Sequence, residues 1–204
     1  VSVAGDVNGD GFSDVLVGAP EMENAGQTDE GHAYCYLGSA EGLQAATAQV
    51  EVAQTNAQFG AAVASAGDVN ADGFADVIIG APLYDNGQAD EGRAFLFLGS
   101  EVGFSTTANW TTESNQANAQ LGASVGSAGD ANGDGYSDFL IGAPLYDDGE
   151  ADEGRTYLFN GTATVPGAAS SWDFYGNQVG AHCGRLVGPA GDVNGDGYSD
   201  ALLS

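Results

Sequence analysis

The feature that most constrains this sequence is an internal repeat with a period of 62 residues. Asp6, Asp68, Asp130 and Asp192 each open a nearly identical block, which reads DVNGDGFSDVLVGAP in its first copy and DVNADGFADVIIGAP in its second. The 204 residues hold three full periods and part of a fourth. Such a period means that one small structural unit is stacked several times, so the unit determines the fold.

Each repeat contains four short apolar runs bounded by Gly, Pro, Asn or Asp, which is typical of β-strands. In the second repeat these runs cover 61–66, 76–81, 94–98 and 109–113. The two middle runs are apolar on successive residues, which indicates strands buried on both faces, whereas the last run alternates and is expected nearer to solvent. Four strands per unit predict an all-β fold, a β-propeller of four-stranded blades.

An acidic loop opens every block and carries oxygen-bearing side chains at fixed spacing. Asp stands at positions one, five and nine, Asn at position three and Gly at position six. Alternate residues of a tight loop point their oxygens toward one centre, and position seven can add its backbone carbonyl. Three carboxylates about 5 Å apart repel each other by roughly 1 to 3 kcal/mol per pair, so they need a cation between them.

An all-oxygen set of six or seven ligands favours Ca²⁺ over Mg²⁺, so we predict four calcium sites. They lie in loops 6–14, 68–76, 130–138 and 192–200. The predicted ligands are Asp6, Asn8, Asp10, Phe12 and Asp14; Asp68, Asn70, Asp72, Phe74 and Asp76; Asp130, Asn132, Asp134, Tyr136 and Asp138; and Asp192, Asn194, Asp196, Tyr198 and Asp200.

Two other interpretations of these loops are an EF-hand and an acidic turn without an ion. The first six positions match an EF-hand, but an EF-hand needs a bidentate Glu at position twelve, where this chain has Val17, Ile79, Ile141 and Leu203. Those residues belong to β-like runs, so the loop is expected to join two strands. An acidic turn without an ion is the second interpretation, and four copies in register argue against it.

These motifs resemble FG-GAP repeats, the blades of the integrin α-subunit propeller and of many bacterial extracellular proteins. Phe59-Gly60 supplies the FG of one unit and Gly80-Ala81-Pro82 its GAP, with the acidic loop between them. Leu121-Gly122 and Cys183-Gly184 replace FG in two units but keep an apolar residue before Gly. The resemblance covers essentially the whole chain, 1–204, as one segment, and it implies a seven-bladed, calcium-bound propeller.

The chain supplies about three and a third blades of such a ring. It begins inside an innermost strand and stops inside a second strand, where the other repeats continue to Gly-Ala-Pro. An open arc leaves strand edges unpaired. We therefore expect either a piece of a longer protein or copies that associate edge to edge as a homo-oligomer.

The charge balance restricts the partners of the chain. The sequence has 29 acidic residues against three arginines and no lysine, and its formal charge is −26. Such a chain cannot neutralise a phosphate backbone or an anionic membrane leaflet, which excludes nucleic-acid binding. No apolar stretch approaches the length of a membrane span, so direct membrane insertion is not expected. The acidity also fits a high-salt habitat.

Single residues outside the loops favour structural roles. His32 occupies the position of Arg93 and Arg155, where a cation is expected to pair with the acidic residues just before it in a solvated contact. Cys35 and Cys183 align with core aliphatic residues, which favours buried thiols over a disulfide.

A second acidic stretch, seen at 85–91 and 147–153, is the most plausible recognition surface. A solvated hairpin loop is the simpler interpretation of it, because charged loops usually need no partner. Trp110 and Trp172 lie 62 residues apart on the last strand run. Packing between blades explains them better than a carbohydrate-binding platform.

These features predict a calcium-binding, non-enzymatic scaffold for cell adhesion or protein interaction, with a protein, matrix or carbohydrate ligand. Extracellular modules bind Ca²⁺ at roughly 10⁻⁴ to 10⁻³ M, so a secreted or cell-surface location is expected. The alternative is the propeller domain of a secreted hydrolase or lyase acting on polysaccharide. That function needs acid and base groups that break the repeat, and neither His32 nor His182 has a convergent partner visible in the sequence.

Overall fold

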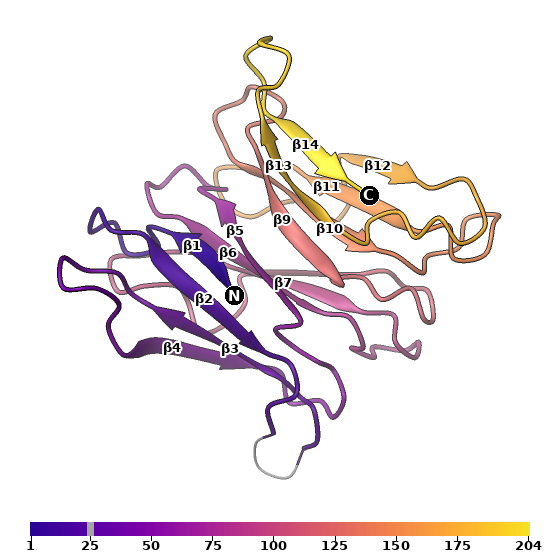
Figure 1. Ribbon diagram of the computed structural model, residues 1–204, viewed down its shortest axis with the longest axis horizontal. Helices are drawn as coiled ribbons and strands as arrows, with labels where there is room; N and C mark the ends of the chain where they lie inside the picture. The colour runs from indigo at the N-terminus through magenta and orange to yellow at the C-terminus, as the bar shows by residue number, and fades with distance from the viewer. Residues whose placement is uncertain (24–26) are drawn as a thin grey trace.

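The computed structural model describes residues 1–23 and 27–204, which form fourteen strands in four antiparallel sheets (Figure 1). The first sheet comprises β1 (Ser2–Gly5), β2 (Asp14–Ala19), β3 (His32–Tyr36) and β4 (Ala46–Glu51). The second comprises β5 (Ala62–Gly67), β6 (Asp76–Ala81), β7 (Arg93–Phe97) and β8 (Trp110–Glu113). The third comprises β9 (Ser124–Gly129), β10 (Asp138–Ala143), β11 (Arg155–Phe159) and β12 (Trp172–Tyr175), and the last β13 (Val187–Gly191) and β14 (Asp200–Leu203). The described residues contain no helix that could cross a lipid bilayer.

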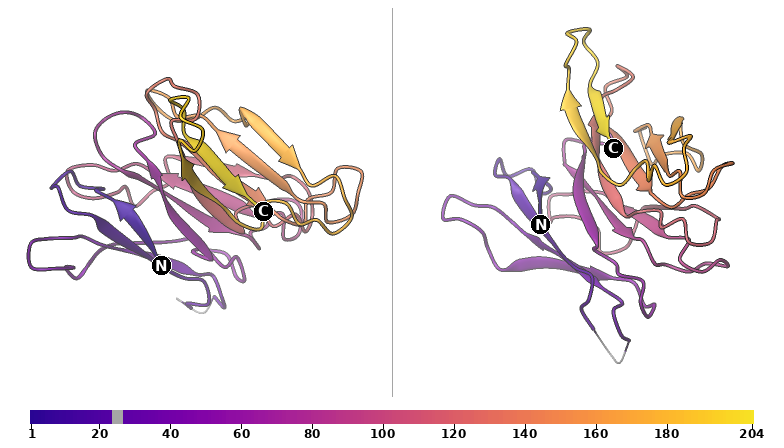
Figure 2. Two further views of the ribbon diagram at one scale, coloured as in Figure 1. Left: turned by 45° about the horizontal axis from the view of Figure 1, so that its top comes forward. Right: turned by 45° about the vertical axis from the view of Figure 1, so that its right-hand side comes forward.

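Each complete sheet pairs its strands in chain order, from an innermost to an outermost strand, as a propeller blade does. The innermost strands β1, β5, β9 and β13 lie side by side, and the sheets fan outward from them (Figures 1 and 2). The arrangement is an open arc of blades, which confirms the predicted fold class. The predicted run 76–81 coincides with β6, the runs 61–66 and 94–98 are displaced by one residue from β5 and β7, and the run 109–113 begins one residue before β8.

Close glycine contacts join neighbouring blades. The amide of Gly60 donates to the carbonyl of Gly80 at 2.9 Å within one blade. The carbonyl oxygen of Gly60 also lies only 1.9 Å from the place where a Cβ on Gly18 of the preceding blade would stand. The same approach recurs between Gly80 and Gly122 and between Gly142 and Gly184. Only a residue without a side chain permits backbones to come this close, which explains the glycines of both motifs physically.

The hydrophobic cores lie between adjacent blades. Phe59, at the entry to β5, is fully buried, and its ring meets Phe95 of β7 edge-on at 5.3 Å. Trp110 of β8 packs against Phe139 and Phe159 of the next blade, with ring centroids 5.5 and 4.8 Å apart. This confirms packing between blades for that tryptophan. Its counterpart Trp172 is 46% exposed, since the sheet that follows it in this chain has two strands.

Both cysteines are buried thiols in different blades, as expected from their alignment with aliphatic residues. Cys35 lies in β3 and is 1% exposed, and Cys183 is 4% exposed. Burial raises the pKa of the Cys35 thiol to about 12. A thiol with so high a pKa is a poor nucleophile near neutral pH, so this residue acts as a small core side chain.

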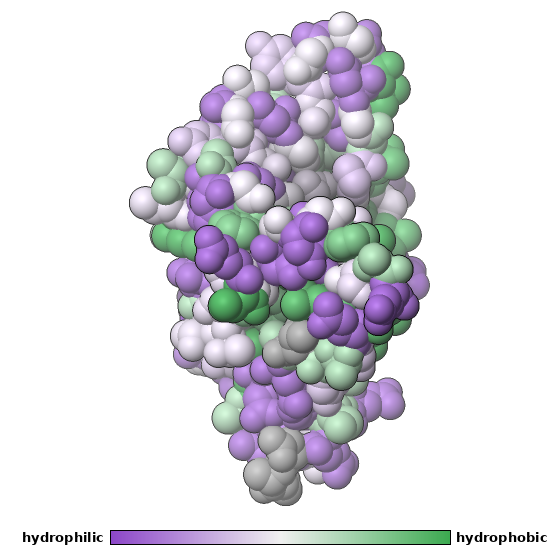
Figure 3. Space-filling model, turned by 90° about the vertical axis from the view of Figure 1, so that its left-hand side faces the viewer, coloured by the Kyte–Doolittle hydropathy of each residue, from purple (hydrophilic) through white to green (hydrophobic). Residues whose placement is uncertain are grey.

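The surface of the first blade is mixed in character. On the side of the molecule that carries β1 to β4, hydrophobic residues lie in scattered groups among hydrophilic ones (Figure 3). The large hydrophobic side chains exposed on the molecule include Val3, Phe12 and Leu43. Isolated apolar residues of this kind are normal on a soluble surface. The visible part of this side therefore offers mainly polar contacts to a partner.

Candidate metal sites

The four acidic loops each connect the innermost strand of a blade to its second strand. Loop 6–14 joins β1 to β2, and the later loops join β5 to β6, β9 to β10 and β13 to β14. Antiparallel pairing in chain order places all four loops at the same end of their blades. The motif therefore lies in a strand–loop–strand context, as the residue at position twelve predicted.

The side chains at positions one and three both accept the backbone amide of position five. In the first loop, the amide of Asp10 donates to Asp6 Oδ1 at 3.0 Å and to Asn8 Oδ1 at 3.1 Å, and the Gly11 amide donates to Asp6 Oδ2 at 2.8 Å. The same three bonds recur in the other loops. The structure thus brings these predicted ligands together in all four copies.

Position seven contacts the same cluster through its amide. Phe12 donates its backbone N–H to Asp10 Oδ1 at 2.9 Å, and Phe74, Tyr136 and Tyr198 make the equivalent bond. This bond holds position seven against the position-five carboxylate. A metal-ligating role for the carbonyl of position seven stays a prediction.

Position nine is the buried anchor of the first three loops. Asp14, Asp76 and Asp138 have no exposed surface. Asp76 accepts the Val69 amide on Oδ2 and the Gly99 amide on Oδ1, each at 2.8 Å, so it ties its own loop to the chain that follows β7. The first and third loops repeat both bonds, and Asp200 accepts the Val193 amide in the fourth. Each carboxylate oxygen has a second lone pair for a cation.

The charge around position nine fits a divalent cation. The pKa of Asp76 is raised to about 7, chiefly by burial, with two backbone amides lowering it and the carboxylates of Asp72 and Asp68 also raising it. Burial likewise raises the pKa of Asp14 and Asp138. The ion pairs seen within residues 1–23 and 27–204 involve none of the loop aspartates. A buried carboxylate beside two others without a cationic partner is the arrangement that Ca²⁺ compensates when bound.

Neighbouring loops are also bonded to each other. The carbonyl of Asp6 accepts the amide of Ala75 at 2.9 Å, and the same bond links Ser137 to Asp68 and Ser199 to Asp130. The ring of Phe74 lies over Gly9 of the preceding loop, where a Cβ would stand 2.8 Å from ring atom Cε1. The four loops therefore form one connected row along the end of the blades.

The second loop departs from the others at position four, which leads to a stability prediction. Ala71 has φ 55°, a left-handed conformation that Gly9, Gly133 and Gly195 adopt elsewhere. This conformation costs a residue with a Cβ about 1 kcal/mol or more. We expect Ala71→Gly to raise the melting temperature by about 2–4 °C, from a gain of about 1 kcal/mol. In Gly9→Ala the added methyl group would also meet the ring of Phe74, so this variant should have a lower melting temperature. An unchanged or lower melting temperature for Ala71→Gly would refute the strain argument.

The expected pairing of the cations at the start of the third strand was wrong for both arginines. Arg93 Nε lies 3.9 Å from Glu113 Oε2, and an Arg155 terminal nitrogen lies 2.6 Å from Asp173 Oδ2, so both contact the outermost strand. Each guanidinium lies over aromatic rings, which turns it away from the acidic residues before it. The glutamates in those preceding segments are buried instead of solvated: Glu30, Glu91 and Glu153. For His32 the expected partner is confirmed, since its Nε2 lies 3.3 Å from Glu30 Oε1, but the contact is buried and not solvated.

Comparison with known proteins supports the repeat assignment. The FG-GAP repeat family matches residues 1–34, 59–97 and 121–159. Integrin alpha-PS2 of Drosophila melanogaster is 33% identical over 216 aligned positions, which cover 98% of this chain and 14% of that protein. Phosphatidylinositol-glycan-specific phospholipase D of Rattus norvegicus is 32% identical over 169 positions, which cover 78% of this chain and 20% of that protein.

A solved structure of an exotype rhamnogalacturonan lyase aligns with all of this chain and 38% of its own, with a TM-score of 0.59 and 16% identity. At that identity the likeness concerns the fold alone. The chain spans only a small part of these proteins, 14% of the integrin and 20% of the phospholipase. The match of the family to more than half of the chain agrees with the blades, the glycine contacts and the loops described above. The chain belongs to the FG-GAP repeat family.

Proposed function

We propose that this chain is a calcium-stabilised propeller module that serves as a non-enzymatic scaffold for adhesion or protein interaction. The observation that carries the proposal is the buried aspartate at position nine, repeated in register and surrounded by carboxylates without a cationic partner. The identity to an integrin α subunit across nearly the whole chain supports the adhesion role. In this proposal Ca²⁺ binds the side-chain oxygens at positions one, three, five and nine and the carbonyl at position seven of each loop.

The proposed location is extracellular, either secreted or at the cell surface. Most of the loop ligands are exposed or partly exposed to solvent, and extracellular all-oxygen sites bind Ca²⁺ at roughly 10⁻⁴ to 10⁻³ M. That concentration is available outside cells and absent from cytosol. Four Ca²⁺ ions would reduce the formal charge from −26 to −18, so a protein or matrix partner would be favoured if it were basic.

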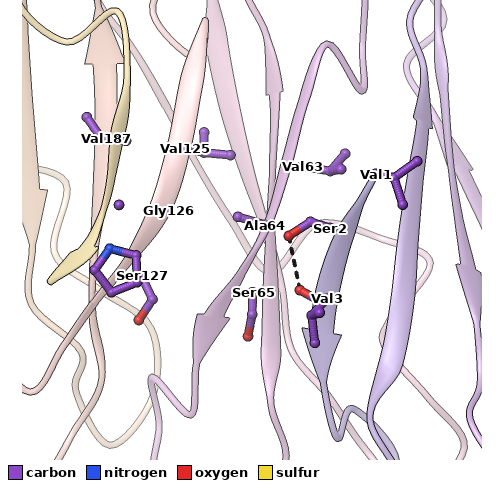
Figure 4. Close-up of a pocket in the computed structure, with 12 residues that line it drawn as sticks. Val1, Ser2, Val3, Val63, Ala64, Ser65, Val125, Gly126, Ser127 and Val187 are labelled. Carbon is purple, nitrogen blue, oxygen red and sulfur yellow. Dashed lines mark hydrogen bonds between the residues drawn. The ribbon is translucent and has the colours of Figure 1, made fainter. Parts of the chain in front are cut away.

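The groove between the innermost strands supports a non-enzymatic role. It has a volume of about 380 Å³, and Val1, Val63, Val125 and Val187 stand in it at equivalent positions of successive blades (Figure 4). The twelve described residues that line it are Val, Ala, Gly, Ser and Pro, and their side chains include no acid or base. Polysaccharide hydrolysis or elimination near this axis would need both. The residues that line this groove therefore give the enzymatic alternative no acid or base to act with.

Calorimetric titration of the chain with Ca²⁺ tests the proposal. We expect one Ca²⁺ site in each of the four loops. Asp72→Asn should remove one site. Asp85→Asn is the matched control, since Asp85 lies outside the calcium loops and its Oδ1, which accepts the Asp90 amide at 2.6 Å, is retained in Asn. Equal Ca²⁺ uptake by both variants would contradict the assigned ligands, and release of fragments from rhamnogalacturonan would contradict the non-enzymatic role.

A further inference from the structure

A second group of metal-ligating side chains lies at the other end of the first blade from its calcium loop. His32 opens β3, Glu51 ends β4 directly opposite it, and Glu30 precedes His32 by two residues. The Nε2 atom of His32 lies 3.3 Å from Glu30 Oε1 and 3.3 Å from Glu51 Oε2. One ligating atom from each residue lies within 4.8 Å of the other two. His32 and Glu30 are buried, and the Glu51 side chain is 39% exposed, so solvent can enter from one side.

The repeat shows that this group is particular to the first blade. The equivalent position holds Arg93 in the second blade and Arg155 in the third, and each guanidinium is held over tyrosine rings, at 5.2 Å from Tyr84 and 4.2 Å from Tyr157. An arginine is permanently charged and cannot ligate a metal. In the first blade a histidine stands there instead, beside two carboxylates. This substitution removes the fixed charge and supplies a nitrogen ligand at the same place.

The distances match a tetrahedral metal site. Zn²⁺ binds His nitrogen and carboxylate oxygen at about 2.0 Å, so two ligands at the tetrahedral angle stand about 3.3 Å apart. Both separations from His32 Nε2 have that value. The contact between His32 Nε2 and Glu30 Oε1 is a hydrogen bond longer than the usual value of about 2.9 Å. Two of the three ligand separations therefore already have the spacing that the ion requires, and the two carboxylate oxygens lie within 4.8 Å of each other.

Gln49 on β4 orients the histidine ring. Its side-chain amide lies 2.8 Å from His32 Nδ1. An amide can present either its oxygen or its nitrogen after a half-turn, so Gln49 can accept the Nδ1 proton and leave the Nε2 lone pair for a metal. A hydrogen bond to the second ring nitrogen is a regular feature of metal-ligating histidines.

We propose that Glu30, His32 and Glu51 bind one Zn²⁺ ion, with water as the fourth ligand. The donor set of one imidazole nitrogen and two carboxylate oxygens suits this borderline ion, whereas Ca²⁺ takes six to eight oxygens. The proton on His32 Nε2 leaves to solvent or is replaced by one on Nδ1 when the ion binds. This site is separate from the calcium loops and does not depend on the function proposed above.

The test is a calorimetric titration of the full chain with Zn²⁺ in excess Ca²⁺, with Co²⁺ absorption as a second probe of tetrahedral geometry. We expect one Zn²⁺ per chain that excess Ca²⁺ does not displace, and a tetrahedral Co²⁺ spectrum. His32→Arg, which installs the residue of the second and third blades, should weaken Zn²⁺ binding by at least about 100-fold. Loss of a residue that only hydrogen-bonds a metal ligand costs about 10- to 100-fold, and loss of the ligand itself should cost more. Gln49→Ala should weaken it about tenfold.

His182→Ala alters the other histidine of the chain and should leave Zn²⁺ affinity unchanged. The melting curve and Ca²⁺ uptake of His32→Arg show whether the variant is folded, and Glu51→Gln provides a second variant with the histidine intact. The proposal is overturned if Zn²⁺ fails to bind in excess Ca²⁺, or if binding persists in folded His32→Arg or Glu51→Gln.

Discussion

Replacing Gly80 by alanine is expected to prevent the chain from folding. The added Cβ would stand 1.9 Å from the carbonyl oxygen of Gly122 and 2.8 Å from its carbon, atoms that belong to the backbone of the next blade. That backbone cannot move aside easily, because the Gly122 amide donates to the carbonyl of Gly142 at 2.9 Å. Overpacking against fixed backbone exceeds the usual 1–3 kcal/mol, and we expect a loss of about 4 kcal/mol or more. Circular dichroism and thermal melting of the purified variant measure it.

Gly188→Ala is the matched control for this variant. Gly188 is also a strand glycine, in β13, but a Cβ on it would meet no atom within 4 Å. This control should melt close to the wild-type temperature, because a methyl group added to open space leaves the packing unchanged. If Gly80→Ala melts like Gly188→Ala, the close approach of the glycine backbones does not determine blade packing.

Removal of Ca²⁺ by a chelator is expected to lower the melting temperature by about 10–20 °C. At an ion concentration ten times the dissociation constant, each independent site contributes about 1.4 kcal/mol, so four sites contribute roughly 5 to 6 kcal/mol. For a domain of this size, 1 kcal/mol corresponds to about 2–4 °C. The bonds between neighbouring loops, such as Ser137 to Asp68, should spread the loss over all blades. Differential scanning calorimetry with and without chelator gives the shift.

Two controls accompany the chelation experiment. Mg²⁺ at equal concentration should not restore the melting temperature, because it demands six ligands in near-ideal octahedral geometry. Asp72→Asn should show a smaller shift than the wild type, since one loop has lost a charged ligand. A melting curve that excess chelator leaves unchanged would remove the structural role of the ion.

Much of the fold followed from the repeat alone. Because the acidic blocks recur at a constant period, turns and apolar runs fall at nearly the same place in each copy, and the run 76–81 predicted β6 to the residue. The tight packing of Trp110 on the next blade followed from the same regularity. Local sequence also predicted that the acidic loop joins two strands, because position twelve carries aliphatic residues.

Contacts between distant residues were not predictable in this way. Arg93 pairs with Glu113, twenty residues later, because the register of β7 and β8 places the two opposite each other. The amide of Gly99 reaches Asp76 from the far end of the next strand. The metal-ligating group at His32 likewise depends on the pairing of β3 with β4, and the sequence showed only that a histidine replaces an arginine. The register of the paired strands determines these three contacts, and the local amino-acid composition does not reveal that register.

The glycine contacts between blades have a consequence for assembly. Each blade presents its FG glycine to the preceding neighbour and its GAP glycine to the following one, so the interface is heterologous and joins units head to tail. Adding or removing one 62-residue unit would preserve every such contact. The number of units in a closed ring is then set by the rotation at each interface, and no single residue specifies it.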